Sequence, residues 1–102
     1  MAEYISYQPS DNFTTVLYSG DNTSPRSITT GFQPDVLWTK NTTTNPNLIW
    51  NSVNGAGTDT ELSTNAAGGE GEKDANLYGY LSAFASTTYT VTTGTTNDNY
   101  VN

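Results

Sequence analysis

The sequence predicts an all-β domain built as an antiparallel β-sandwich or jelly roll. Neutral polar residues dominate the 102-residue chain: nineteen Thr suit pleated strands, and twelve Asn, together with Gly, suit turns. The apolar runs are short and separated by turn signals at nearly regular spacing, which gives about seven strands. The chain has no Cys, so its core or neighbouring subunits must supply its stability.

The first twelve residues are expected to form an arm or the first strand of the domain. Large apolar side chains alternate loosely there, until Pro9 and Asn12 interrupt the pattern. Such an arm can pair with a sheet edge, either its own or a neighbour's. The candidate assembly contacts are Tyr4, Ile5 and Tyr7. The predicted sandwich domain follows over residues 13–102.

Two strands are predicted at the start of the sandwich domain. "FTTVLYSG" (13–20) is rich in β-forming residues and runs into a Gly-Asp-Asn turn. "RSITT" (26–30) follows Pro25, which lacks a backbone N–H and therefore suits a strand start or a sheet edge.

The next predicted strand is the most apolar one and lies in "GFQPDVLWTKN". Gly31 permits a bend, and Pro34 keeps the chain extended before the strand. The strand then places Val36 and Trp38 on one face and Leu37 on the other. Two apolar faces predict a central strand covered on both sides, with Trp38 in the core.

An antiparallel hairpin is expected between this strand and "LIWNSV" (48–53), because the connection is short. The hairpin would bring Trp38 and Trp50 near each other in one core. A weak strand is predicted in "TELST" (60–64), followed by an exposed loop over 65–76.

The last third of the chain contains one ambiguous segment and one clear strand. "LYGYLSAFAS" (77–86) fits either a strand or a short helix. "TTYTVTTG" (87–94) predicts a strand with Tyr89 and Val91 on one face. A final strand is expected to begin at residues 100–101.

Charge and composition exclude several classes of function. The net charge is -7, and the cations are Arg26, Lys40 and Lys73, so the chain lacks the basic cluster that nucleic acid requires. No apolar run approaches the roughly 20 residues of a membrane span, so no membrane insertion is expected. The absence of His and Cys removes the commonest general base and the commonest transition-metal ligands. No cofactor or metal is expected.

Paired carboxylates are the remaining candidates for catalysis. Asp59 with Glu61, and Glu70 with Glu72, have the i,i+2 spacing that places two side chains on one face of a strand. Glycosidases use two carboxylates across a cleft. Solvated loop charges are the favoured interpretation of both pairs, and the chain is expected not to be an enzyme.

Carbohydrate binding is a second functional class to consider, because aromatic rings stack on sugars and Asn side chains bind their hydroxyls. The large aromatic residues Phe32, Trp38, Trp50 and Phe84 are expected in the core. The candidates for glycan stacking are therefore tyrosines of the C-terminal third: Tyr78, Tyr80 and Tyr89.

Four stretches of the chain, in order, resemble a known domain: "YISYQPSDNF", "LYSGDNTSPRSITTGFQPDVLWTKN", "SVNGA" and "ELSTNAA". The domain is found in tail-fibre and other virion structural proteins of tailed bacteriophages, notably marine ones. The resemblance covers nearly the first 70 residues, and "GFQPD..W.KN" is its specific part. The residues expected in the motif core are Gly31, Phe32, Pro34, Trp38 and Trp50.

Three departures from the family pattern lie outside this motif. Asn54 stands where an arginine is usual, and "SAFASTTYTV" follows the family's "SFDSDGFT" strand only loosely. The closing strand begins at "YV" (100–101), but the chain ends at Asn102, before the family's closing tryptophan. The chain is therefore expected to be the N-terminal part of a longer polypeptide. The resemblance implies a lectin-like or SPRY-like β-sandwich without enzymatic activity.

The function that the resemblance implies is a structural module of a tail fibre or surface appendage, located on the virion surface. The alternatives are a capsid decoration protein and a carbohydrate-binding module for host recognition. Expected partners are other virion proteins and copies of the chain itself, with a trimer as one form. A host-surface glycan is the partner in the last alternative.

Overall fold

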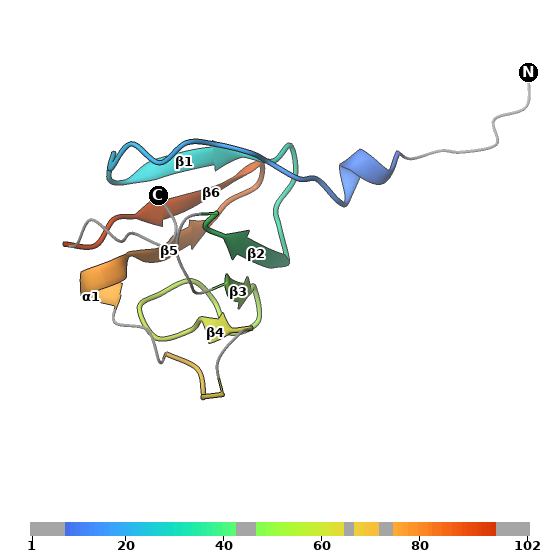
Figure 1. Cartoon of the computed structure of the whole chain (residues 1–102). Helices are drawn as coiled ribbons and strands as arrows, with labels where there is room; N and C mark the ends of the chain where they lie inside the picture. The colour runs from blue at the N-terminus through green and yellow to red at the C-terminus, as the bar shows by residue number, and fades with distance from the viewer. Residues whose placement is uncertain (1–7, 43–46, 65–66, 72–74, 96–102) are drawn as a thin grey trace, which may run out of the picture.

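The computed structural model is a β-sandwich of two three-stranded antiparallel sheets (Figure 1). One sheet has the strand order β1-β6-β5 and the other β2-β3-β4, which confirms the predicted all-β antiparallel sandwich. The strands are β1 (Arg26–Thr29), β2 (Val36–Lys40), β3 (Asn47–Asn51), β4 (Leu62–Ser63), β5 (Tyr80–Phe84) and β6 (Thr88–Thr92). Two short helices, η1 (Pro9–Asp11) and α1 (Ala75–Tyr78), complete the elements. The structure describes residues 8–42, 47–64, 67–71 and 75–95.

The core lies between the sheets and takes side chains from both of them. Buried and partly buried residues alternate along β3 and β6, as expected for strands with one face on a core. The loop after β3 is tied to the opposite sheet, because the Gly57 N–H donates to the Leu81 carbonyl over 3.0 Å. The buried apolar residues are Ile28, Leu48, Trp50, Leu81, Tyr89 and Val91.

The segment between β1 and β2 carries the chain from one sheet to the other. Gly31 has a φ of 86°, a conformation that residues with a side chain rarely adopt, so the bend expected at this glycine is confirmed. Its N–H donates to the Thr87 carbonyl over 3.1 Å, and the Thr30 hydroxyl donates to the Phe32 carbonyl over 2.6 Å. Pro34 is buried, so the motif holds the crossover against the body of the domain.

The prediction that β2 is a central strand with a buried Trp38 is wrong. Among the described strands β2 pairs only with β3, and Trp38 is 65% exposed. Residues directly opposite each other in an antiparallel pair share a face. Leu37 lies opposite Trp50, on the core side, whereas Trp38 lies opposite Ile49 on the outer side. The hairpin is therefore confirmed, but its two tryptophans lie on opposite faces of the sheet.

The strand predicted over residues 13–20 is also absent. This segment has no regular secondary structure, and Phe13 and Leu17 are 73% and 94% exposed. β-forming residues make a strand only where a neighbouring backbone completes the ladder of hydrogen bonds. The side chain of Arg26 contacts the end of the segment at Ser19 and the following turn at Asp21.

The remaining elements follow the predictions more closely. The segment 60–64 contributes only the two residues of β4. The ambiguous segment 77–86 contains both alternatives: α1 ends at Tyr78, Gly79 turns the chain with a φ of 82°, and β5 follows. The strand predicted over 87–94 is confirmed as β6. The expected strand at 100–101 lies outside the described residues.

The burial of the two tryptophans predicts opposite effects of truncation. Trp50→Ala removes a fully buried side chain and should lower the free energy of unfolding by about 3–5 kcal/mol. Trp38→Ala removes a side chain from the surface and should change it by less than about 1 kcal/mol. Chemical denaturation of both variants measures this difference. Equal losses in the two variants would contradict the β2–β3 register.

Candidate functional site

The outer face of the β2-β3-β4 sheet carries a row of apolar side chains. Trp38 lies opposite Ile49, which lies opposite Leu62, so the three form one line across the three strands. Trp38 is 65% exposed and Leu62 is 41% exposed, and Val36 adds a further 65% exposed side chain on the same face of β2. Large exposed apolar groups gathered in this way mark interaction surfaces in soluble proteins. We call this row the β2 face.

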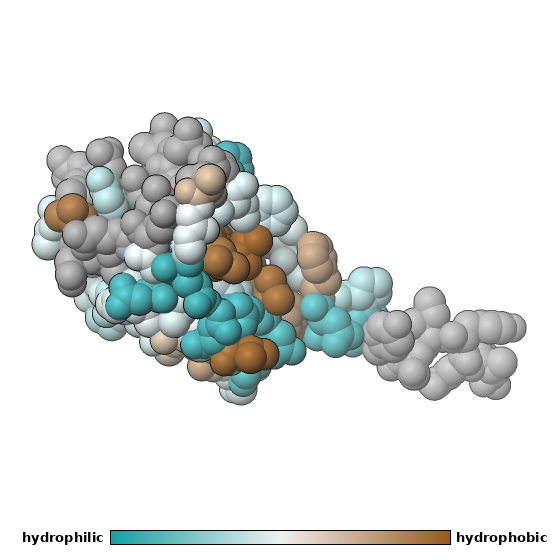
Figure 2. Space-filling model, turned by 90° about the horizontal axis from the view of Figure 1, so that it is seen from below, coloured by the Kyte–Doolittle hydropathy of each residue, from teal (hydrophilic) through white to brown (hydrophobic). Residues whose placement is uncertain are grey.

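A groove of about 700 Å³ lies beside the β2 face, between β2 and the N-terminal segment 11–16. Its lining includes Val36, Leu37 and Trp38 and no residue of β3, so it follows the side of β2 that faces away from β3. Figure 2 shows apolar side chains gathered where the N-terminal segment meets the body of the domain. The lining residues are Asp11–Val16, Thr30, Phe32–Trp38 and Tyr89.

Polar side chains lie at both ends of β2. At its start, the Ser52 hydroxyl donates to the Asp35 carboxylate over 2.9 Å and the Ser52 N–H donates to the Asp35 carbonyl over 2.8 Å. At its end, the Lys40 ammonium donates to the Asn47 amide oxygen over 3.1 Å. The Asp35–Ser52 contact joins "GFQPD" to "SVNGA", so the two motifs form one structural unit.

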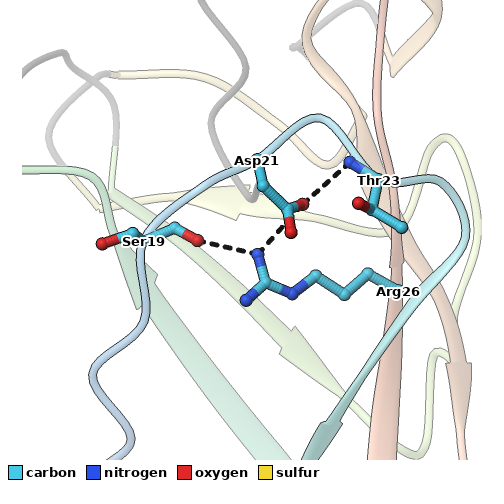
Figure 3. Close-up of polar contacts among 4 residues, drawn as sticks. All are labelled: Ser19, Asp21, Thr23 and Arg26. Atoms are coloured by element: carbon cyan, nitrogen blue, oxygen red, sulfur yellow. Dashed lines mark hydrogen bonds and ion pairs between the residues drawn. The ribbon is translucent and has the colours of Figure 1, made fainter.

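A cluster around Arg26 holds the N-terminal segment against the β1-β6-β5 sheet (Figure 3). The guanidinium donates to the Ser19 carbonyl over 2.7 Å and pairs with the Asp21 carboxylate at 3.2 Å. It also lies over the Tyr18 ring, 5.1 Å from the centroid, where a cation–π attraction adds to the contact. The Thr23 N–H donates to the same carboxylate over 2.9 Å and lowers the pKa of Asp21.

Tyr18 and Tyr89 form the buried end of this cluster. Burial raises the pKa of both hydroxyls above their ordinary value, and more strongly for Tyr89. The Tyr89 hydroxyl is hydrogen-bonded to Tyr18, which further favours its protonated form. Both rings therefore act as neutral anchors that join the N-terminal segment to β6.

The three predicted stacking tyrosines do not form one exposed surface. Tyr89 is only 3% exposed, so the expectation that it stacks on a glycan is wrong. Tyr78 and Tyr80 are half-buried. Two other aromatic rings, Phe13 and Trp38, are exposed instead. The sequence interpretation placed Trp38 in the core because apolar residues lie on both sides of the strand. The predicted assembly contacts Tyr4, Ile5 and Tyr7 lie outside the described residues.

Burial separates the two members of the acid pair Asp59 and Glu61. Glu61 is 3% exposed whereas Asp59 is exposed, so the two carboxylates differ in their access to solvent. Glu70 accepts a hydrogen bond from the Asn54 amide, and Glu72 lies outside the described residues. Within the described ranges, no three acidic, His or Cys side chains gather as metal ligands, and no helix is long and apolar enough to span a bilayer.

The chain belongs to a family of domains of unknown function (DUF7483), which matches residues 8–102. The match therefore takes in the N-terminal segment, the groove and both sheets. No curated protein and no solved structure shows significant similarity to the chain. Because the family description assigns no activity, a proposal about function depends on the residues and their geometry.

The tyrosine pair predicts a specific alkaline instability. A group whose pKa is raised on folding contributes its full stability below its unfolded pKa, here about 10, and loses that contribution as the pH rises toward the folded pKa. We expect the free energy of unfolding to fall above pH 10 by up to about 1.4 kcal/mol per pH unit and per group. Tyr89→Phe should make this slope shallower. Denaturant titrations across this pH range provide the measurement, and an unchanged slope in the variant would contradict the assignment.

Proposed function

We propose that this domain is a structural module of a bacteriophage virion, one unit of a tail fibre or surface appendage, and that the β2 face is the surface through which it assembles. The capsid decoration role expected as an alternative would use the same surface. The single observation that carries the proposal is the 65% exposure of Trp38 inside the motif that resembles phage virion proteins.

The resemblance gains weight from the way its parts fit together. The crossover at Gly31 and Pro34 positions β2, and the Asp35–Ser52 contact fixes the start of β2 against the end of β3. The motif residues thus position one exposed strand rather than a polar cleft. The motif therefore presents the β2 face to solvent, where it is available to bind another protein.

Exposed aromatic side chains are favourable centres of protein interfaces. Trp is among the residues that most often dominate binding energy, because a large rigid ring loses much water-exposed area at little entropic cost. Here Val36, Ile49 and Leu62 surround it with further apolar area. Polar groups on the same face, among them Lys40 and Asn47, supply the rim that such interfaces have.

Carbohydrate binding is the second candidate, and the same tryptophan favours it. The Trp38 ring is exposed, and the side chains of Asn47 and Asn51 lie on the same face of the sheet, one at each end of the row. A ring flanked by amide groups offers sugars both stacking and hydrogen bonds. A glycan array separates the two functions, since this candidate requires binding by the wild-type domain and its loss in Trp38→Ala.

The virion assignment predicts where the protein is found. Mass spectrometry of density-purified particles from a culture that expresses this protein should detect the chain at a fixed ratio to the major capsid protein. That ratio should match a symmetric copy number, since virion components occupy symmetry-related positions. Detection only in the soluble fraction of lysed cells would overturn the proposal.

The β2 face predicts which substitution prevents incorporation. Trp38→Ala should weaken association with the particle on the order of tenfold or more, as expected for an interface tryptophan. Val53→Ala is the matched control, because Val53 is 92% exposed but lies in the loop after β3. Copy number per particle is the measurement. Equal incorporation of both variants would exclude the β2 face as the assembly surface.

A further inference from the structure

The backbone of β2 presents a row of hydrogen-bonding groups on the side away from β3. In an antiparallel pair only alternate residues bond to the partner strand. Because the Ser52 N–H donates to the Asp35 carbonyl, the bonded positions in β2 continue at Leu37 and Thr39. The N–H and C=O groups of Val36, Trp38 and Lys40 therefore point outward, and none of them meets a backbone partner among the described residues.

The groove runs along these outward-facing groups. Its far wall is the segment 11–16, of which residues 13–16 have no regular secondary structure and pair with no strand. Edge strands with exposed apolar side chains invite pairing with another extended chain. The arrangement of an open edge and an adjoining groove fits one added strand, the mode known as β-augmentation.

The N-terminal arm of this chain, "MAEYISY" (1–7), has the sequence such a strand requires. Glu3, Ile5 and Tyr7 alternate with Tyr4 and Ser6, so they would share one face of a strand. The arm joins the described chain at Gln8, whose N–H donates to the Asp11 carboxylate over 3.0 Å. Asp11 itself lines the groove.

Charge sets the direction of the added strand. The β2 edge is acidic at its start, where Asp35 lies, and basic at its end, where Lys40 lies. An antiparallel arm places Glu3 opposite Lys40 and then Ile5 opposite Trp38. A parallel arm of the same register would place Glu3 at the acidic end, where like charges repel.

We propose that residues 3–7 of a second copy of this chain add to β2 as an antiparallel strand, with Glu3 opposite Lys40, Ile5 opposite Trp38 and Tyr7 opposite Val36. The donor is a second copy because η1, of which only the last residue lines the groove, projects from the body of the domain, so the described chain begins away from β2 (Figure 1). Ile5 and Tyr7 then cover the apolar side chains of the β2 face. This inference rests on the proposed assembly role and names the partner and the contact.

Disulfide trapping tests the register directly, since the chain contains no Cys of its own. Ile5→Cys and Trp38→Cys are purified as separate full-length proteins, mixed and oxidised. Directly opposed residues of an antiparallel pair bring their Cα atoms within disulfide range. Ile5→Cys mixed with Val53→Cys is the control. We expect on the order of tenfold more linked heterodimer from the first mixture, because pairing raises the effective concentration of the thiols.

Three outcomes would overturn the inference. The first is equal linking in both mixtures. The second is an intramolecular disulfide in the double variant Ile5→Cys with Trp38→Cys, together with no linking in the mixture of single variants. That result would mean that the arm occupies the groove of its own chain. The third concerns charge: adding Glu3→Lys to the Ile5→Cys donor should reduce its linking to the Trp38→Cys acceptor severalfold. Adding Lys40→Glu to the acceptor should then restore the linking. If Glu3→Lys causes no reduction, the register is refuted. These tests use purified protein, so their failure would refute the strand addition even if the chain is found in virions. Absence of the chain from virions would refute the proposed function even if the two copies link in solution.

Discussion

The fold and the candidate site both depend on one pairing, that of Leu37 in β2 with Trp50 in β3. Side chains alternate along a strand, so this register decides the face of every residue in the hairpin. It places Trp50 between the sheets, where it is fully buried, and leaves Trp38 on the surface. A shift of β2 by one residue would place Trp38 opposite Trp50, on the same face of the sheet. The core and the exposed face are therefore two consequences of the same set of hydrogen bonds.

The same pairing explains why the edge of β2 remains available. The hairpin uses the backbone groups of Leu37 and Thr39 and leaves those of the alternate residues pointing outward. The Arg26 cluster holds the following turn of the N-terminal segment against the other sheet. The segment 11–16 lines the far wall of the groove and pairs with no strand. An open edge and a fixed wall together define a space suited to one extended chain.

The sequence predicted the fold class because Thr-rich runs and Gly/Asn turns have few other stable arrangements. It also predicted the hairpin and the buried face of β6. It misplaced Trp38, because a strand with apolar residues on both faces gives no sign of which face a second sheet covers. It missed the irregular state of 13–20 for a related reason: strand formation depends on a partner backbone, which local sequence does not reveal. The site was therefore visible only once the register was known.

Amide hydrogen exchange of the full-length chain tests the central claim most directly, because it reports each backbone group of β2 separately. At low protein concentration we expect protected amides at Leu37 and Thr39 and rapid exchange at Val36, Trp38 and Lys40. As the concentration rises and a second copy adds its strand, the latter three should gain protection. Protection of Trp38 with rapid exchange of Leu37 in the dilute protein would contradict the register, and with it the account of both the core and the assembly edge.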